Sequence, residues 1–397
     1  MTQKKNPYLK LAGPVDLEKI KQSAKRHRKD AVKRWSIAAL LIIMIVSGSY
    51  LLVKNRSYTS VRKAASYEEE TSDTNRYAQF GDGIVRYSRD GIVYLNRKNE
   101  EQWIQPCQMK NPVIDVNEET FAVGDSGGNS ILVFTEKGLK GEMETTLPIE
   151  KMSVSSQGIV SAILKNEGAP MIVSYDATGN ILVEHQATLN STGYPLALDL
   201  SRDGMTLAVS YLSTKDGAVK SRVAYYNFGE EGKSRTDYEV SMEEYDGSII
   251  PEVYFMDDTT SVAVSDSSFI IYEGKEIPQK KKEVEINQEI KSVFHTDKYI
   301  GFVLLNKNKS GYEARLYNKS GKQVMNKAFA GEYSSVRMHE DEIIMFEGTK
   351  CCIITKNGIM RFKGDLQTNA LEVIPARGIN RYLVMSADEL RIVYLVK

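Results

Sequence analysis

Residues 198–210 read LDLSRDGMTLAVS, which is an apolar run, a short polar turn and a second apolar run. This order, with Asp-Gly in the turn, predicts two antiparallel strands joined by a hairpin. The unit containing these residues begins near residue 196. Six other segments with the same order begin near residues 113, 152, 253, 292, 335 and 373. We therefore expect a fold built from a repeated unit of short strands.

A turn that ends in glycine recurs within the same region. It follows an apolar strand and precedes another strand at Gly138, Gly179, Gly229, Gly274, Gly321 and Gly358. The mean spacing of these glycines is 44 residues, which is the length of a four-stranded propeller blade. Glycine suits a tight hairpin because the turn needs positive φ, which a Cβ atom opposes. The predicted fold is therefore an all-β propeller.

The number of blades follows from the number of units. The seven units and a weaker one at residues 77–106 predict eight blades. A seven-bladed ring is the alternative, because that first unit is degenerate. The last unit has room for only three strands, and an open blade edge would invite aggregation. We expect a segment before the first unit, residues 59–66 (TSVRKAAS), to supply the missing strand.

Several of these segments resemble known repeats. Residues 198–210 resemble the WD-repeat-like propeller repeat, in which Ser-Pro-Asp-Gly joins the two inner strands; here Arg202 replaces the proline. LYNKSGKQV and SYDATGNIL resemble the strand–turn–strand of quinoprotein-type repeats. The layout of basic leader, one apolar helix and divergent propeller is similar to an uncharacterised bacterial membrane-anchored family, a domain of unknown function. These resemblances imply a fold and no activity.

The formal net charge of zero hides regions of opposite charge. Residues 1–34 carry eleven basic and three acidic side chains, whereas residues 54–397 carry 41 basic and 49 acidic ones. The run WSIAALLIIMIVSGSYLLV, residues 35–53, separates them and is uncharged. Because phosphate contacts need basic side chains, the acidic region argues against nucleic-acid binding by the propeller.

The uncharged run has the length and composition of a transmembrane helix. Its 19 residues would rise about 28 Å as an α-helix, close to the thickness of the bilayer hydrocarbon. A buried core helix and a cleaved signal peptide are the alternatives. They fit less well, because the run is uninterrupted and follows a long basic leader. The residues assigned to the membrane anchor are Trp35, Leu40, Leu41, Ile42, Ile43, Ile45, Tyr50 and Leu52.

Basic side chains before the apolar run predict its orientation, since such residues are retained on the cytoplasmic side. They are Lys25, Arg26, Arg28, Lys29, Lys33 and Arg34. We interpret them as a topology determinant that contacts anionic lipid, rather than as a nucleic-acid patch or nuclear signal. The chain then divides into a cytoplasmic leader (1–34), a transmembrane helix (35–53), a polar linker with the closing strand (54–75) and an extracytoplasmic propeller (76–397).

The sequence GDSGG at residues 124–128 matches the signature around the nucleophilic serine of chymotrypsin-like proteases. It also fits the G-x-S-x-G nucleophile elbow of α/β-hydrolases. Such a serine needs a histidine base and a carboxylate. In the protease order the histidine precedes it, and His27 lies across the predicted membrane. The nucleophile elbow needs a following helix, which the pattern does not predict. Residues 262–272 of another unit align with this stretch, so we interpret GDSGG as a hairpin turn.

Other candidate groups are dispersed. His185, His295 and His339 fall in different units without metal-ligand spacing. The turn residues Asp203 and Asp257–Asp258 are interpreted as separate, solvated acids. Cys351 and Cys352 are adjacent in a predicted strand and should point to opposite faces, and Cys107 has no predicted partner. Trp103 is the single tryptophan outside the apolar run, which disfavours a quinone-cofactor site. The sequence therefore predicts no cofactor and no metal.

These observations favour a non-enzymatic role at the outer surface of the cytoplasmic membrane. We expect an interaction platform or sensor for an envelope protein or a cell-wall glycan. The alternative is a propeller-fold enzyme acting on an envelope polymer, of the glycan hydrolase or lyase type. That alternative predicts carboxylates or histidines that converge at the propeller axis.

Reducing the positive charge of the leader tests the predicted topology. Changing all six basic residues named above to Gln lowers the balance of residues 1–34 from +8 to +2, and a fraction of the chains should then insert with the propeller inside. Labelling of a single cysteine in the propeller with an impermeant reagent, in intact cells, measures that fraction. If the unaltered chain reacts only after lysis, the predicted orientation is wrong.

Overall fold

The computed structural model describes residues 17–54, 56–68, 74–96, 98–188, 191–215, 217–306 and 311–397. The chain divides into two compact units, Met1–Arg56 and Ser57–Lys397. Residues 1–16 of the predicted leader and 69–73 of the predicted linker lie outside the described residues.

The first unit contains one long helix, α1 (Leu17–Lys54). Its stretch Val32–Tyr50 is long and apolar enough to cross a membrane. Within the unit, Trp35, Leu40, Leu41, Ile42, Ile43, Ile45 and Tyr50 are each more than half exposed. The side chain of Leu52 lies outside the described residues. By length and composition this stretch is compatible with a single-pass membrane anchor or with a signal sequence. The six basic residues assigned as topology determinants lie on this same helix and are exposed.

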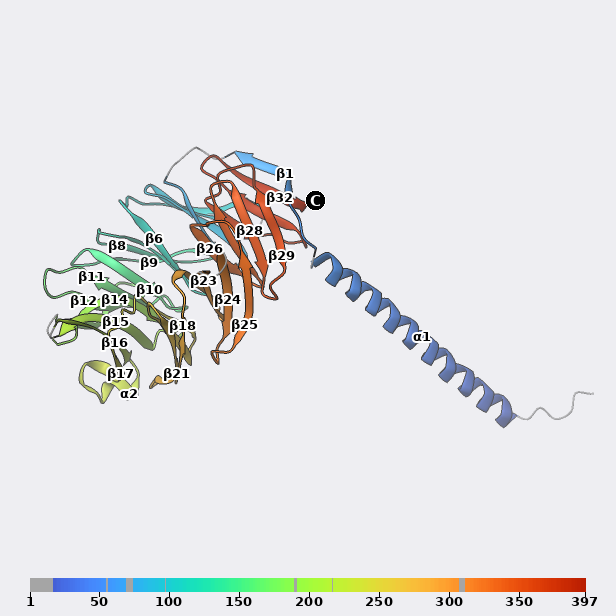
Figure 1. Ribbon diagram of the computed structural model, residues 1–397, viewed down its shortest axis with the longest axis horizontal. Coiled ribbons are helices and arrows are strands. Elements are labelled where there is room, and N and C mark those ends of the chain that lie inside the picture. The colour runs from blue at the N-terminus through green and yellow to red at the C-terminus, as the bar shows by residue number, and fades with distance from the viewer. Residues whose placement is uncertain are drawn as a thin grey trace, which may run out of the picture. The chain divides into compact units, whose positions relative to one another are not determined.

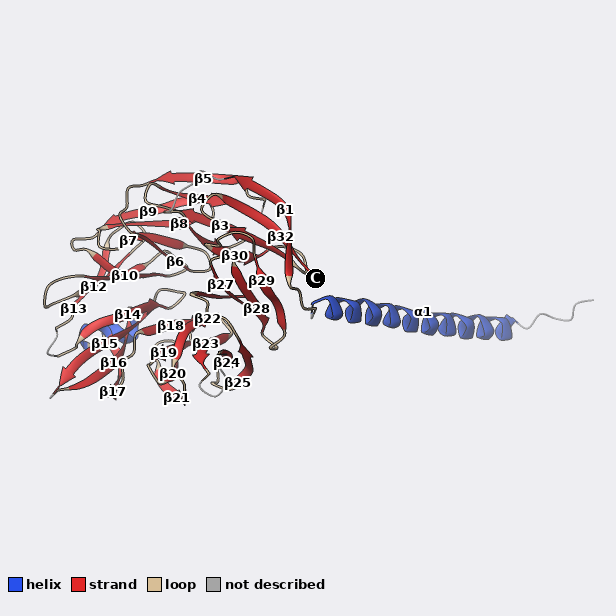
Figure 2. Cartoon of the chain, turned by 45° about the horizontal axis from the view of Figure 1, so that its top comes forward, coloured by secondary structure: helices blue, strands red, loops and turns tan. Residues whose placement is uncertain are grey.

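The second unit is an eight-bladed β-propeller, as the repeat predicted, and each blade is a four-stranded antiparallel sheet (Figures 1 and 2). Blade 1 consists of β2 (Arg76–Phe80), β3 (Gly83–Tyr87), β4 (Gly91–Leu95) and β5 (Glu101–Pro106), and blade 2 of β6 (Pro112–Val116), β7 (Phe121–Asp125), β8 (Ser130–Thr135) and β9 (Gly138–Glu144). Blade 3 consists of β10 (Ile149–Val154), β11 (Val160–Leu164), β12 (Met171–Tyr175) and β13 (Ile181–Gln186), and blade 4 of β14 (Tyr194–Leu200), β15 (Thr206–Lys215), β16 (Ala218–Asn227) and β17 (Glu239–Asp246). Blade 5 consists of β18 (Glu252–Asp257), β19 (Thr260–Val264), β20 (Ser268–Glu273) and β21 (Gln279–Glu285), and blade 6 of β22 (Ile290–His295), β23 (Tyr299–Leu305), β24 (Tyr312–Asn318) and β25 (Gln323–Phe329). Blade 7 consists of β26 (Ser335–His339), β27 (Glu342–Glu347), β28 (Lys350–Thr355) and β29 (Met360–Asp365), and blade 8 of β30 (Glu372–Pro375), β31 (Arg381–Met385), β32 (Glu389–Val396) and β1 (Ser60–Glu68).

The ring has two faces, which follow from the antiparallel order of the strands. The turns from the first to the second strand and from the third to the fourth strand of each blade lie on one face, which we call the turn face. The turns from the second to the third strand and the connections between blades lie on the other, the crossover face. The predicted turn glycines therefore belong to the turn face.

Strand β1 closes the ring. It lies at the outer edge of blade 8 and pairs antiparallel with β32, from Ser60 opposite Val396 to Glu68 opposite Glu389. Lys63 and Ser66 both contact the Glu389 carboxylate. This is the segment that the sequence predicted as the missing fourth strand. Blade 8 thus combines both ends of the propeller chain, and the outer edge of β32 is paired.

Eight hydrophobic clusters hold the blades together, and each cluster is shared by neighbouring blades. At the junction of blades 8 and 1, Tyr77 and Val93 pack with Ile374 and Leu383. This junction joins the start of the repeat to its end, so the apolar contacts continue around the ring.

Five of the six turn glycines have the positive φ that a tight hairpin requires; the φ angles of Gly138 and Gly274, for example, are 117° and 135°. The expectation is wrong at Gly229, where φ is −84°. Gly229 is instead the N-cap of the short helix α2 (Glu230–Lys233), which is followed by η1 (Thr236–Tyr238). An insertion therefore replaces the tight turn between β16 and β17.

A charge on the closing strand should open the ring. Val61 is 7% exposed and packs with Phe362 and Leu395. In Val61→Asp an unpaired carboxylate is buried, which should lower the free energy of unfolding by about 3 kcal/mol and promote association through the freed edge of β32. Denaturant unfolding and light scattering of the full chain in detergent measure both effects. The control Ser60→Asp, at an exposed position of the same strand, should change neither, and equal behaviour of the two variants would contradict this role of β1.

Candidate functional site at the channel mouth

A cavity of about 700 Å³ lies among the innermost strands of blades 2–6. The carboxyl ends of these strands and their turns form much of its wall, so we describe it as the channel mouth. The polar residues that line it are Asp115, Asn117, Glu118, Lys151, Asp199, Arg202, Glu252, Tyr254, His295, Thr296 and Asp297. Its volume falls in the range typical of ligand pockets, about 300–1,000 Å³.

A chain of hydrogen bonds connects the innermost strands of blades 2–5. Asp115 Oδ2 accepts from the Val154 backbone N–H at 2.7 Å. Ser153 Oγ donates to Asp199 Oδ1 at 2.7 Å, and Asp199 Oδ2 accepts from the Phe255 backbone N–H at 2.6 Å. Each of these three side chains reaches the strand of the next blade. The carboxylates therefore brace the wall of the channel, and the strand positions that carry them repeat from blade to blade.

Burial changes the protonation of these two carboxyl groups. It raises the pKa of Asp115, and burial together with the charge of Asp115 raises the pKa of Asp199 to about 7. Desolvation and a like charge both disfavour the ionised form of an acid. Asp199 is consequently protonated in part of the molecules at neutral pH.

The innermost strands of blades 5 and 6 carry an aromatic pair. The imidazole of His295 stacks on the Tyr254 ring, with a centroid distance of 3.7 Å and an interplanar angle of 9°. His295 lines the cavity and keeps an exposed edge, and desolvation by the surrounding walls lowers its pKa to about 4. The imidazole is therefore neutral at physiological pH. The Tyr254 hydroxyl is buried and has no hydrogen-bond partner among the described residues.

Arg202 spans the mouth from the turn of blade 4. Its Nη1 lies 2.6 Å from Glu118 Oε1 of blade 2, and its Nη2 donates to the Met256 carbonyl of blade 5 at 3.3 Å. A proline at this position, as in the repeat that the sequence resembles, could make neither contact. The departure from the repeat thus places a cation at the mouth of the channel.

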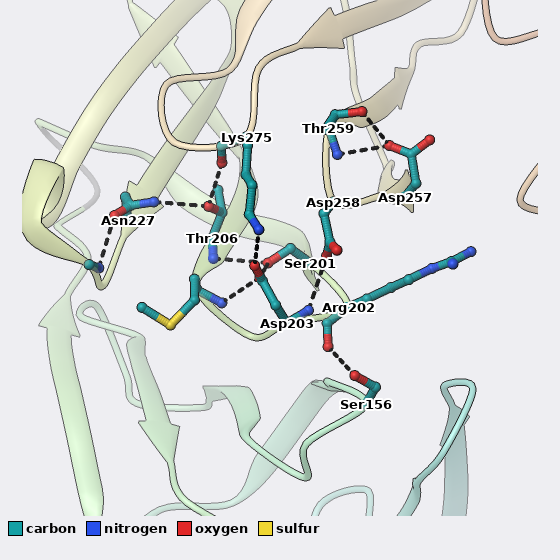
Figure 3. Close-up of polar contacts among 12 residues, drawn as sticks. Ser156, Ser201, Arg202, Asp203, Thr206, Asn227, Asp257, Asp258, Thr259 and Lys275 are labelled. Atoms are coloured by element: carbon teal, nitrogen blue, oxygen red, sulfur yellow. Dashed lines mark hydrogen bonds and ion pairs between the residues drawn. The ribbon is translucent and has the colours of Figure 1, made fainter.

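The turn that carries Arg202 is held by the two neighbouring blades (Figure 3). Asp203 Oδ2 pairs with Lys275 Nζ at 3.0 Å, and the Asp203 backbone N–H donates to Asp258 Oδ1 at 3.1 Å. On the other side, Ser156 Oγ donates to the Arg202 carbonyl at 2.6 Å. The expectation that Asp203 and Asp258 are separate, solvated acids is wrong, because packing of adjacent blades brings their turns into contact.

A second set of bonds fixes the strands behind this turn (Figure 3). Thr206 Oγ1 donates to the Lys275 carbonyl at 2.9 Å and accepts from Asn227 Nδ2 at 3.1 Å. Asp257 Oδ1 accepts from both the backbone N–H and the hydroxyl of Thr259, each at 2.8 Å. The mouth is therefore preorganised by contacts within and between blades.

The structure places the candidate catalytic and metal-ligating residues of the sequence in different blades of the fold. Residues 124–128 lie at the end of β7 and in the turn that leads to β8, and Asp125 Oδ1 accepts two backbone N–H bonds from Lys110 and Asn111. This stretch is a hairpin turn, as interpreted. Histidines 185, 295 and 339 belong to blades 3, 6 and 7. Among the described residues, no group of three His, Cys, Asp or Glu side chains could hold a metal ion.

The adjacent cysteines behave as the strand pattern predicted. Cys351 belongs to the hydrophobic cluster between blades 7 and 8, whereas Cys352 belongs to the cluster between blades 6 and 7. They therefore point to opposite faces of β28, and both are buried, free thiols.

Sequence reasoning missed the hydrogen-bonded chain of Asp115, Ser153 and Asp199. Each of them is the single polar residue between apolar neighbours near the end of an innermost strand. That recurring polar position was the available signal, and alignment of the units at their turns would have revealed it.

The raised pKa of Asp199 makes stability depend on pH. Its folded value of about 7 exceeds the ordinary value of about 3.9, so the native state loses stability as pH rises between these values. Asp199→Asn cannot ionise and should reduce the fall in Tm between pH 5 and pH 8 by several degrees. Calorimetry of the full chain measures this fall. Asp297→Asn, at the same mouth, is the control and should keep the original slope; an unchanged slope in Asp199→Asn would contradict the assignment.

Comparison with solved structures identifies the same fold elsewhere. BamB from Moraxella catarrhalis is 12% identical and has a TM-score of 0.50, over 84% of this chain and 100% of that chain. Saccharomyces cerevisiae Sqt1 is 9% identical and has a TM-score of 0.56, over 84% of this chain and 99% of that chain. A search of curated proteins gave no match. The model of a family of unknown function, DUF5711, matches residues 54–395, and the chain belongs to that family.

Proposed function

We propose that the protein is a membrane-anchored interaction platform, whose propeller binds an envelope protein or a cell-wall glycan outside the cytoplasmic membrane. The observation that carries this proposal is the cavity of about 700 Å³ at the channel mouth, which five consecutive blades line. A partner seated there would contact turns from several blades at once, and rigid walls reduce the entropy lost on binding.

The polar groups of the mouth support binding better than catalysis. Asp115 and Asp199 accept hydrogen bonds from the backbone of the next blade, and Arg202 is paired with Glu118. Groups that are committed to the wall can present a fixed pattern of charge to a partner. Rearranging any of them for chemistry would cost contacts between blades.

One observation favours the enzymatic alternative. Asp115 and Asp199 approach the same channel, and a carboxyl group with a pKa of about 7 could serve as a general acid in glycan cleavage. That alternative requires hydrolysis or elimination of an envelope polymer by the purified chain. Asp199→Asn would abolish such an activity, whereas the platform should still bind its partner.

The location belongs to the same proposal. Helix α1 contains an apolar stretch of sufficient length to cross a bilayer, and six exposed basic residues lie before that stretch or in its first turn. We infer a single-pass anchor with the N-terminus inside and the propeller outside. The predicted domain limits, 1–34, 35–53, 54–75 and 76–397, are part of this inference.

Site-specific crosslinking in membranes tests the platform. A photo-reactive residue at Glu118, whose side chain is 61% exposed at the mouth, should give a discrete adduct with an envelope component. The same residue at Ile181, which is 53% exposed on the outer strand of blade 3, is the matched control and should not. Adducts of equal yield at both positions, or hydrolysis of an envelope polymer that Asp199→Asn abolishes, would contradict the proposal.

A further inference from the structure

A second, smaller cavity lies between blades 6 and 7, with a volume of about 230 Å³. It is lined by the start of β22, β24 and β26 and by the end of β23, β25 and β27. By strand direction these ends all belong to the crossover face, so this cavity is separate from the channel mouth. Its volume is below the range of about 300–1,000 Å³ that drug-sized ligands need, so it suits a single ring.

The wall of this cavity is aromatic. Tyr312 and Phe329 are stacked with a centroid distance of 5.9 Å, and the ring of Tyr333 lies 6.1 Å from that of Phe329. Phe329 is buried, whereas both tyrosines are half-buried. The floor consists of Val303, Val336 and Met345, which are buried. A ligand must therefore present an apolar face to enter.

Tyr333 packs closely against the local backbone. Gly331 has a φ of +110°, and a Cβ atom there would lie 2.9 Å from the Tyr333 hydroxyl oxygen. The absence of a side chain at Gly331 allows the tyrosine ring to fold against this segment. The aromatic wall is thus formed before any ligand arrives.

The rim of the cavity is polar, and most of it is available to a ligand. Ser292, Glu332, Ser334 and Glu347 line the cavity, and none of their side chains makes a hydrogen bond or ion pair with another described residue. Two hydroxyl groups and two carboxylates therefore surround an apolar floor. This combination suits a ring with one apolar face and hydroxyl groups around its edge.

The charge of the rim restricts the ligand further. The one lysine of the rim, Lys291, is paired with Glu289 at 2.6 Å and is attracted more weakly by Glu332. Glu332 and Glu347 then leave the rim negative, which repels a carboxylate or phosphate on the ligand. Carboxylates accept hydrogen bonds from pairs of sugar hydroxyl groups, and these charge-assisted bonds are the stronger kind.

We propose that the cavity between blades 6 and 7 binds one uncharged pyranose ring of a glycan. The ring stacks on Tyr312 and Tyr333 through its C–H face, and its hydroxyl groups donate to Glu332 and Glu347. An aliphatic or aromatic side chain of a partner protein is a poorer fit, because it would offer no hydrogen-bond donor to the two carboxylates. The inference goes beyond the platform proposed above and does not depend on the channel mouth.

Ligand-observed NMR of the full chain in nanodiscs tests this inference. The probes are two neutral disaccharides, cellobiose and N,N′-diacetylchitobiose, and one anionic disaccharide, digalacturonate. Saturation transfer should reach the ring C–H protons of a neutral probe and be absent for digalacturonate. Tyr312→Ala and Tyr333→Ala should each weaken binding about tenfold through the lost stacking area.

Further variants distinguish loss of the binding site from loss of folding. Glu332→Gln and Glu347→Gln retain side-chain size, and combined they should weaken the neutral probe and admit digalacturonate. Tyr194→Ala, at a half-buried tyrosine on the crossover face of blade 4, is the matched control and should bind as the unaltered chain does. Glu118→Gln, at the channel mouth, should also bind the sugar normally, which separates this site from the platform.

Three outcomes would overturn the proposal. The first is that no neutral probe receives saturation transfer from the unaltered chain. The second is that binding survives in both tyrosine variants, which would place the sugar elsewhere. The third is that a photo-crosslinker at Tyr333 captures a protein while no sugar binds, which would assign the cavity to a partner's side chain.

Discussion

The pairing of β1 with β32 is the contact on which the rest of the propeller depends. Blade 8 receives three strands from the end of the chain and its fourth from residues that precede blade 1. Without that strand, β32 would present an unpaired edge, and the cluster that contains Val61, Phe362 and Leu395 would lose one side. Closure lets every blade pack against two neighbours. The three cysteines are free thiols, so ring closure stabilises this domain without disulfides.

The same packing determines the character of the channel. An innermost strand faces its neighbours across a narrow space, and polar groups there must find partners in the next blade. Asp115 and Asp199 do so through the backbone N–H groups of Val154 and Phe255. These bonds fix the strand spacing. Burial between the strands raises the pKa of both carboxyl groups, and the charge of Asp115 raises that of Asp199 further. Close packing of the innermost strands therefore underlies both the rigidity and the unusual protonation of the mouth.

Two cavities of different chemistry result from this architecture. The channel mouth is bounded by turns that carry charges of both signs, whereas the cavity between blades 6 and 7 has an aromatic wall and a polar rim. They belong to different parts of the repeat, since one uses the ends of innermost strands and the other a space between neighbouring sheets. A propeller can therefore present independent sites on its two faces, although the buried clusters between its blades are all hydrophobic.

Sequence alone determined the elements that depend on local pattern. Repeated strand–turn–strand units, turn glycines such as Gly274 and the short last unit were sufficient to predict eight blades and a closing strand before residue 76, because hairpins and strand periodicity are encoded within a few residues. The apolar helix at 35–53 could also be predicted from its own residues. Gly229 was mispredicted, since an insertion looks like a turn until its backbone is known. Only the tertiary structure decided what lies at the channel mouth and between blades 6 and 7. Asp115 and Asp199 are 84 residues apart, and their proximity arises from the order and packing of the blades, which no local pattern specifies.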